Sequence, residues 1–425
     1  IINGGGGTLQ FKLGESYTMT HNITMNDTTT ISTNGQTITH TGVLSGTGAL
    51  IKLGGGTLIL NGASNNSGPL EIQGGILQVS SSTLPTGAIS FQGYGGTLRA
   101  ADDLTIGQSI TVSIQANLDT NGNTVTVNGL ILGGAPLTKV GEGTLILSNP
   151  GNNFTGKTSI NQGTLKATSS SFPASAGGAQ QLVFSGNTGF STFQAASDFS
   201  NFVPSIALLS PGVIDTNGYN ITLNGVIAGS QSLTKVGQGT LTFGNTGNIF
   251  TGNLIISDGT LNATPETITA NVGGMQQLVF GGEQFIALLD DYVTNPIFQL
   301  GADFPDFVPN IVLVSDGSID TTANGYSITV YGNVIGSATH TLHTLGTGTV
   351  TFKGQSFFSG LLNLREGATM FLEGLSASSV NVEAGGTLRG HSMTTGNITL
   401  QNQANWHVSS SIGQAIVGDK ATIFL

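Results

Sequence analysis

The chain repeats a long segment of its own sequence, and this restricts the folds open to it more than any other feature. Residues 119–167 and 215–263 align without a gap, and more than half of the aligned positions are identical. Two copies with more drift occupy about 32–80 and 320–371. Such self-similarity is typical of architectures that stack one structural unit on the next. We therefore predict one continuous repeat domain over residues 1–425.

Short runs of alternating apolar and variable residues predict β-strands. In Leu145-Ile146-Leu147 and Leu241-Thr242-Phe243, which follow the same Gly-x-Gly-Thr motif, the first and third residues are large and apolar. Alternation over so few residues, bounded by glycine and asparagine, is typical of strands with one buried face. We expect Leu145 and Leu147 to point into the core. No segment has the period, caps and length of a helix.

Asn-Gly pairs separate the strands in all four copies, at Asn34, Asn121, Asn217 and Asn324. Such pairs could close the hairpins of an antiparallel sandwich. A unit of about 96 residues that repeats without gaps is better explained by about four coils of ~24 residues, with Asn and Gly at corners that need positive φ. The sequence thus predicts an all-β fold, a parallel β-helix (β-solenoid) of ~17–20 coils stacked about 4.8 Å apart.

The charge content argues against several classes of partner. Only 8% of the residues are charged, and 11 Lys and Arg against 22 Asp and Glu give a net charge of −11. Such a chain has little with which to displace counterions from nucleic acid or to bind anionic membranes. The sequence contains no cysteine, which removes disulfides and thiol chemistry. No apolar run reaches the ~18 residues of a membrane-spanning helix.

One repeated motif resembles the passenger-associated repeat of bacterial autotransporters. It consists of Leu137-Thr138-Lys139-Val140-Gly141-Glu142-Gly143-Thr144-Leu145, then Asn153-Phe154-Thr155-Gly156, then Gly163-Thr164-Leu165, and residues 233–261 match it equally well. The resemblance implies a right-handed parallel β-helix displayed outside a bacterial cell. It implies export through a C-terminal outer-membrane β-barrel, which together with the signal peptide lies outside this sequence. It also implies an adhesin, aggregation factor or surface-coat protein, because the enzymes of this family carry their chemistry in separate inserted domains.

Candidates for catalysis or ligand binding are weak. The serine run 169–171 has no nearby histidine to act as a base. His340 and His343 would point to opposite faces of a strand instead of sharing a metal, and we expect both to face solvent. One repeat position carries a lysine that we expect on an outer face, in a ladder of like charges open to a glycan or an anion; its members are Lys52, Lys139 and Lys235. We predict no catalytic residue, no metal and no cofactor.

An insertion at about 283–297 is the strongest local candidate for a binding site, because it interrupts the regular repeat with an apolar run. Loops on a rigid scaffold commonly carry binding residues. The predicted partner-contact loop consists of Phe285, Asp290, Asp291, Tyr292 and Phe298. The alternative is a surface insertion that packs back onto the stack. The two adjacent aspartates also keep open a polysaccharide lyase or hydrolase, although neighbouring residues on a strand diverge.

The sequence therefore predicts a non-enzymatic extracellular β-solenoid that acts by surface display, cell adhesion or self-association into a coat or filament. The ends of a stack are open sheet edges, so we expect lateral or end-to-end association of chains. The other expected partner is a host or cell-surface protein or a glycan. A phage or viral fibre is the remaining alternative, because such fibres also use β-solenoids and usually form trimers.

Overall fold

The protein is a parallel β-solenoid of about 17 turns. The computed structural model describes residues 7–11, 14–173, 181–186, 191–268, 277–281, 296–354, 357–365, 367–373, 376–417 and 422–424. Within these ranges the chain forms strands, turns and loops but no helix, so no helix there could cross a membrane. The described strand pairings are parallel, which confirms the predicted fold class.

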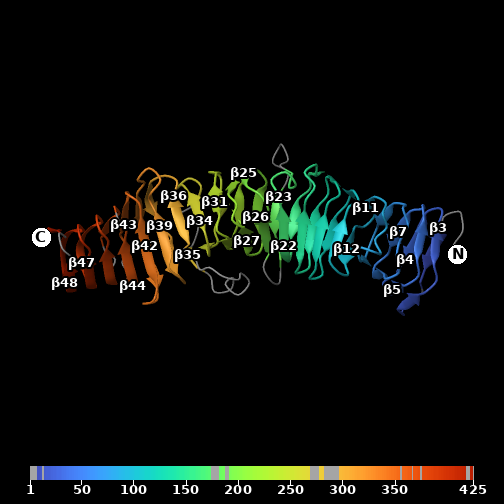
Figure 1. Ribbon diagram of the computed structural model, residues 1–425, viewed down its shortest axis with the longest axis horizontal. Helices are drawn as coiled ribbons and strands as arrows, with labels where there is room; N and C mark the ends of the chain where they lie inside the picture. The colour runs from blue at the N-terminus through green and yellow to red at the C-terminus, as the bar shows by residue number, and fades with distance from the viewer. Residues whose placement is uncertain are drawn as a thin grey trace. The chain divides into compact units, whose positions relative to one another are not determined.

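The chain divides into two compact units, Ile1–Asp198 with Val203–Ser210 and Phe199–Phe202 with Pro211–Leu425. In the first unit, successive turns stack strand on strand in rows, coloured blue to green in Figure 1. The first row is β1 (Gly7–Gln10), β4 (Thr29–Ser32), β7 (Leu50–Leu53), β9 (Leu70–Ile72), β11 (Ile89–Phe91), β14 (Ile110–Val112), β17 (Ile131–Gly133) and β20 (Asn153–Phe154). The second row is β2 (Tyr17–Met19), β5 (Thr37–His40), β8 (Thr57–Leu60), β10 (Ile76–Val79), β12 (Gly96–Ala100), β15 (Ala116–Asp119), β18 (Leu137–Val140), β21 (Thr158–Ile160), β23 (Gln181–Phe184) and β26 (Ser205–Leu208). The remaining strands are β13 (Leu104–Ile106), β16 (Thr124–Val127), β19 (Thr144–Leu147), β22 (Gly163–Ala167) and β24 (Ser191–Ala195), with the separate pair β3 (Ile23–Met25) and β6 (Leu44–Gly46).

The second unit is built in the same way. One row is β27 (Gly212–Asp215), β30 (Leu233–Val236), β33 (Leu254–Ile256), β35 (Gln277–Phe280), β38 (Asn310–Leu313) and β41 (Val334–Gly336). The next is β25 (Phe199–Phe202), β28 (Ile221–Leu223), β31 (Thr240–Phe243), β34 (Thr260–Ala263), β36 (Ile297–Leu300), β39 (Gly317–Asp320), β42 (Thr341–Leu345), β44 (Phe357–Leu364) and β46 (Ser376–Val382). The long strand β47 (Thr387–Leu400) joins that row to a third, which is β37 (Phe304–Phe307), β40 (Ile328–Val330), β43 (Thr349–Phe352), β45 (Thr369–Leu372), β48 (Asn405–Val417) and β49 (Thr422–Phe424). The short strands β29 (Ile227–Gly229) and β32 (Ile249–Phe250) complete the unit.

The core is a stack of aligned apolar side chains. Val125 pairs with Leu145, and Leu145 pairs with Leu165, so a turn takes 20 residues here. All three side chains are buried, as is Leu147, which confirms the inward direction predicted for Leu145 and Leu147. Each apolar layer is covered above and below by the next turn, and burial of a side chain of this size contributes about 1.5–3 kcal/mol.

The corners explain why the repeat needs its Asn-Gly and Gly-x-Gly motifs. Positive φ occurs at Asn34, Asn121, Asn217 and Asn324 (50° to 56°), as predicted for the Asn-Gly pairs. In the Gly-x-Gly motif, the first glycine also has positive φ, for example 79° at Gly141. The second is needed for a different reason: a Cβ on Gly143 would overlap the carbonyl oxygen of Asn123 in the preceding turn.

The copies of the repeat are not aligned on one side of the solenoid. In the first unit, the chain passes from β7 through β9, β11 and β14 to β17 in one row, and the equivalent strand β18 comes next, in the other row. In the second unit, it passes from β30 through four turns to β41 and then enters β42, again in a different row. One copy therefore advances the chain by four turns plus one further strand, and equivalent strands of consecutive copies face different sides of their unit.

Candidate functional site

The polar clusters that the structure builds repeatedly are centred on buried lysines. Lys52, Lys139 and Lys235 are each 0% exposed. The prediction that they form an outer ladder is wrong. Each lysine comes two residues after a buried leucine, so the alternation of the strand turns it inward with that leucine. Lys52 in β7 and Lys139 in β18 also lie in different rows, so they cannot stack on each other.

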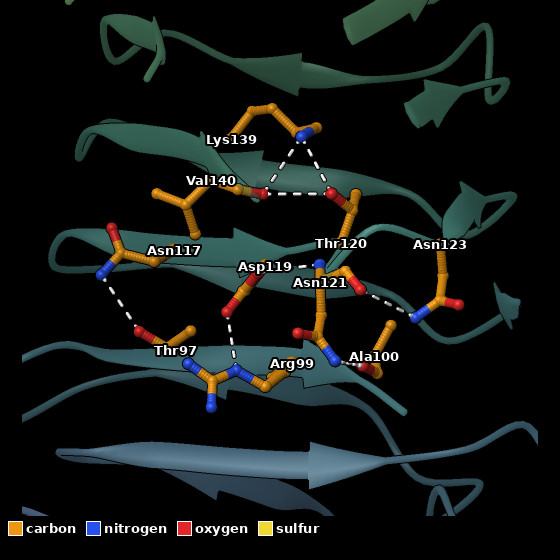
Figure 2. A network of polar contacts seen from close by, with 10 residues as sticks. All are labelled: Thr97, Arg99, Ala100, Asn117, Asp119, Thr120, Asn121, Asn123, Lys139 and Val140. Carbon is orange, nitrogen blue, oxygen red and sulfur yellow. Dashed lines mark hydrogen bonds and ion pairs between the residues drawn. The ribbon is translucent and has the colours of Figure 1, made fainter. Parts of the chain in front are cut away.

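Lys139 shows how these ammonium groups are accommodated (Figure 2). Its Nζ donates to Thr120 Oγ1 (2.9 Å) and to the carbonyl oxygens of Val140 (3.1 Å), Gly141 (2.5 Å) and Gln162 (3.0 Å). Thr120 follows β15, Val140 ends β18, and Gln162 follows β21. Those are three consecutive strands of one row, so a single ammonium group joins three turns at their corners.

Lys235 repeats this arrangement in the second unit. Its Nζ donates to Thr216 Oγ1 (3.0 Å), to the carbonyl oxygens of Val236 (3.1 Å) and Asp258 (3.0 Å), and to that of Gly237. These acceptors match those of Lys139 position by position. Polar groups buried in this way must be satisfied by hydrogen bonds, and the lysine satisfies corner carbonyls that strand pairing leaves over.

Two further copies show how the arrangement varies. Lys52 donates to the carbonyl oxygens of Leu53 (3.2 Å), Gly54 (2.8 Å) and Gly74 (2.9 Å). In the fourth copy the equivalent residue is Thr344, which is too short to reach the corner and whose Oγ1 has no hydrogen-bond partner among the described residues. The buried ammonium therefore occurs in three of the four copies, at Lys52, Lys139 and Lys235.

Burial lowers the pKa of each of these lysines, because a charged group loses hydration in the interior. The pKa falls to about 8 for Lys52 and for Lys139, where Asp119 partly opposes the shift. It falls to about 7 for Lys235, where Asp258 and Asp215 oppose it. None of the three side chains is open to solvent, so they bind within the fold and do not offer an accessible base or nucleophile.

We predict from these pKa values that the folded chain becomes more stable as the pH is raised from 7 to about 9.5. Between the folded pKa of about 7 to 8 and the ordinary value of 10.5, the unfolded chain binds more protons than the folded one, so the free energy of unfolding rises with pH. Urea denaturation at several pH values measures this. The slope should be smaller in Lys235→Met and unchanged in Lys166→Met, and a midpoint that is flat or falls with pH would contradict the prediction.

The carboxylates near the lysines also have structural partners. Asp119 accepts from Arg99 Nε (2.7 Å) through one oxygen and from the Asn121 backbone N–H (2.9 Å) through the other, as Figure 2 shows. Asp215 and Asp320 accept the corresponding backbone N–H two residues on, at 2.7 and 2.8 Å. Asp119 and Asp215 thereby hold the first residue of an Asn-Gly corner, whereas Asp320 holds Thr322, two residues before Asn324.

His343 lies elsewhere than expected. It is only 9% exposed, and its Nδ1 lies 3.0 Å from Nδ2 of Asn363. Burial and the nearby Arg365 lower the pKa of His343, while Asp316 and Glu383 partly oppose them. The prediction that His343 faces solvent is wrong, because the residue paired beside it on β44 is another polar side chain that packs against it. His340 is half-buried, and its Nδ1 lies 2.9 Å from the Leu313 carbonyl oxygen. Among the described residues there is no cluster of three metal-ligating side chains.

Most of the predicted partner-contact loop lies outside the described residues, namely Phe285, Asp290, Asp291 and Tyr292. Phe298 is described, in β36, and is 0% exposed. Its ring packs against Phe304 (centroids 5.7 Å apart) and Phe307 (6.1 Å). Phe298 is therefore a core residue and not a contact residue, because the strand alternation that follows the insertion turns it inward.

Comparison with known proteins agrees with the motif. The family profile of the passenger-associated-transport repeat matches residues 50–79, 137–167 and 233–263, each of which contains one buried lysine. The chain is also 27% identical over 266 residues to the adhesin BmaC autotransporter of Brucella suis biovar 1 (strain 1330). This alignment covers 61% of the chain but only 7% of the adhesin, so the chain corresponds to a small part of that protein. No solved structure matches the chain at a significant level.

The matched segments are those in which a buried lysine joins the corners of consecutive turns. The family's sequence pattern and the hydrogen bonds of the lysines therefore describe the same structural unit. Each of these positions of the motif helps the turns to stack: the lysine bonds corner carbonyls, the two glycines allow the tight corner, and the apolar pairs fill the core. The chain is a parallel β-solenoid that contains passenger-associated-transport repeats and is similar to part of an autotransporter adhesin, and this similarity implies export to the cell surface.

Proposed function

We propose that this segment is an adhesive and non-enzymatic part of a surface-displayed passenger. The observation that carries the proposal is where its reactive side chains lie. The repeat lysines and the corner aspartates are bound to backbone groups inside the stack, which leaves threonine, serine and amide side chains to form much of the outer surface. A surface of that kind supports many weak contacts, which add up when several are made together. The similarity to an autotransporter adhesin supports the same role.

Attachment of coated beads tests the adhesive role. Beads carrying the purified chain should bind to a layer of epithelial cells several-fold more than beads carrying albumin. Beads carrying the urea-unfolded chain are the matched control, since they present the same composition without the stacked surface. Attachment no better than albumin would refute the proposal.

Self-association is a second part of the proposal. The weakly charged outer surface opposes contact between chains less than a highly charged one would. We expect sedimentation velocity to show species larger than a monomer as the concentration is raised. A strict monomer at high concentration would rule this part out and would leave the adhesive role standing.

The absence of enzymatic activity is tested separately. We expect no release of reducing ends or unsaturated products from acidic or neutral polysaccharides incubated with the chain. Turnover that is lost in Asp290→Asn and Asp291→Asn would replace the proposal with a polysaccharide-active enzyme.

A further inference from the structure

We propose that one sheet face of the second unit binds an acidic polysaccharide, one that carries carboxylate or sulfate groups. This face, named here the threonine face, is the outer surface of β43, β45, β47 and β48. The inference rests on the proposed adhesive function and names the chemistry of a ligand for it. It is carried by the residues that line the face, by two cations that lie over aromatic rings, and by the alignment of these groups along the stack.

Two parallel rows of side chains form the threonine face. The strands are paired so that residues of one row lie directly beside each other on consecutive turns. The first row is Thr349, Thr369, Thr387 and Asn405. The second row is Thr351, Phe371, Arg389 and His407. The residues between the two rows, such as Val350 and Met370, are buried, so both rows point outward.

A third column borders the face at the corner of the turns. Tyr331 follows β40, Lys353 follows β43 and Glu373 follows β45, and backbone hydrogen bonds hold these three positions beside the strands of the neighbouring turns. Tyr331 is 44% exposed. The face therefore combines hydroxyl and amide groups, an exposed aromatic ring and cations, which are the groups that bind sugar hydroxyls, sugar ring faces and acid groups respectively.

The two cations on this surface lie over aromatic rings. Lys353 Nζ lies 5.5 Å from the centroid of the Tyr331 ring, and the Arg389 guanidinium lies 5.5 Å from that of Phe371. A cation over a ring keeps its charge and most of its N–H donors. Arg389 is exposed and makes no ion pair or hydrogen bond with any residue in the described part of the chain.

An exposed guanidinium without a carboxylate partner is unexpected in a chain with 22 Asp and Glu and only 11 Lys and Arg. Arginine presents a planar set of donors that matches a carboxylate or a sulfate. Arg389 lies next to the row of threonines, two residues after Thr387 on the same strand. An acidic sugar bound there would therefore have a partner for its acid group beside partners for its hydroxyls.

The negative charges near the face limit where the polymer lies. Glu373 pairs with Lys353 at 3.6 Å, with both side chains 38% exposed, and such an exposed pair is worth little and can exchange partners. Asp306 of β37 is exposed at the far end, before Tyr331. The favourable stretch thus runs from Tyr331 to Arg389, three strand spacings or about 14 Å, which accommodates a short run of sugars along the stack.

Binding of defined polymers by the full chain tests the proposal. The probes are heparin, which carries sulfate, hyaluronan, which carries carboxylate alone, and dextran, which is neutral. We expect binding to at least one of the two acidic polymers, no binding to dextran, and weakening as salt is added because the contact is exposed. Binding to heparin alone assigns sulfate as the ligand group, and binding to hyaluronan assigns carboxylate.

Arg389→Gln should weaken binding by roughly tenfold, because it removes a charge-assisted contact. Lys166→Gln is the matched control, since Lys166 is also a cation in an outward row but lies in the first unit beside Ile146 and Gln194; it should leave binding within about twofold. Circular dichroism should show that both variants are folded. Equal binding by Arg389→Gln and the parent chain, binding to dextran, or no binding to either acidic polymer would each overturn the inference.

The bead assay separates this inference from the adhesive role. If the coated beads attach to cells but neither acidic polymer binds, the threonine face is refuted and the adhesive function stands. If the polymers bind through Arg389 but the beads do not attach, the face is a polysaccharide site and the adhesive function fails.

Discussion

Lys139→Met should destabilise the first unit by about 3 kcal/mol at pH 7. Methionine is close to lysine in length and fills most of the same space, so the expected loss comes from hydrogen bonding and not from a cavity. The carbonyl oxygens of Gly141 and Gln162 would lose the donor that the lysine supplies. A buried acceptor without a partner costs about 1–3 kcal/mol, and two of them give the expected effect. Urea denaturation monitored by circular dichroism measures it.

The control for this variant is Lys166→Met in β22, which belongs to another row of the same unit. Lys166 stands in an outward row, so its replacement should change the free energy of unfolding by no more than about 0.5 kcal/mol. If both substitutions have equally small effects, the ammonium group of Lys139 does not stabilise the corners, and its burial would have to be explained otherwise.

Gly143→Ala should destabilise the same unit by at least about 3 kcal/mol, a large effect for the addition of one methyl group. Gly143 does not need positive φ, so its conformation is open to alanine. The new Cβ would instead overlap the carbonyl oxygen of Asn123 and stand 2.7 Å from the carbonyl carbon of that residue. Both atoms belong to the backbone of the turn beneath, so they cannot rotate away, and the turns would have to separate. Thermal and urea denaturation should both report the loss.

Gly107→Ala is the matched control. Gly107 is exposed, lacks positive φ, and has open space where a Cβ would be placed. Alanine there reduces the freedom of the unfolded chain, so it should be neutral or stabilise by up to about 1 kcal/mol. Equal effects at the two positions would mean that the distance between stacked turns does not decide which glycines are required.

Much of the fold could be predicted from the sequence because the same local pattern of residues occurs in each copy of the repeat. The alternation in Leu145-Ile146-Leu147 gave the strand and its buried face, and the four Asn-Gly pairs gave corners with positive φ. These features depend on a residue and its near neighbours. The predicted coil length of ~24 residues was only approximate. Regular turns take 20 residues, and the turn from Leu165 to its partner Phe193 is longer.

The pattern of a single strand was not sufficient to predict where the lysines lie. In Leu137-Thr138-Lys139 the period of two places lysine on the inner side, and that signal was present in the sequence. It was outweighed by the usual cost of burying a charge. What offsets that cost is a set of oxygens from residues 120, 140, 141 and 162. Those acceptors converge only when three turns are stacked, so no local pattern reveals them.

The sequence by itself determined that this chain is a parallel stack of short strands, which apolar residues face its core in the regular copies, and which motif relates it to autotransporter passengers. The sequence also predicted about four coils per repeat, but only the tertiary structure showed that each repeat adds one further strand, so equivalent strands face different sides of their unit. The tertiary structure also decided that Phe298 belongs to the core and that Thr387 and Arg389 share an outer face with Phe371. The physical reason is the same in each case: the neighbours of a residue in a solenoid are a full turn away along the chain, and the length of each turn is fixed by how the turns pack.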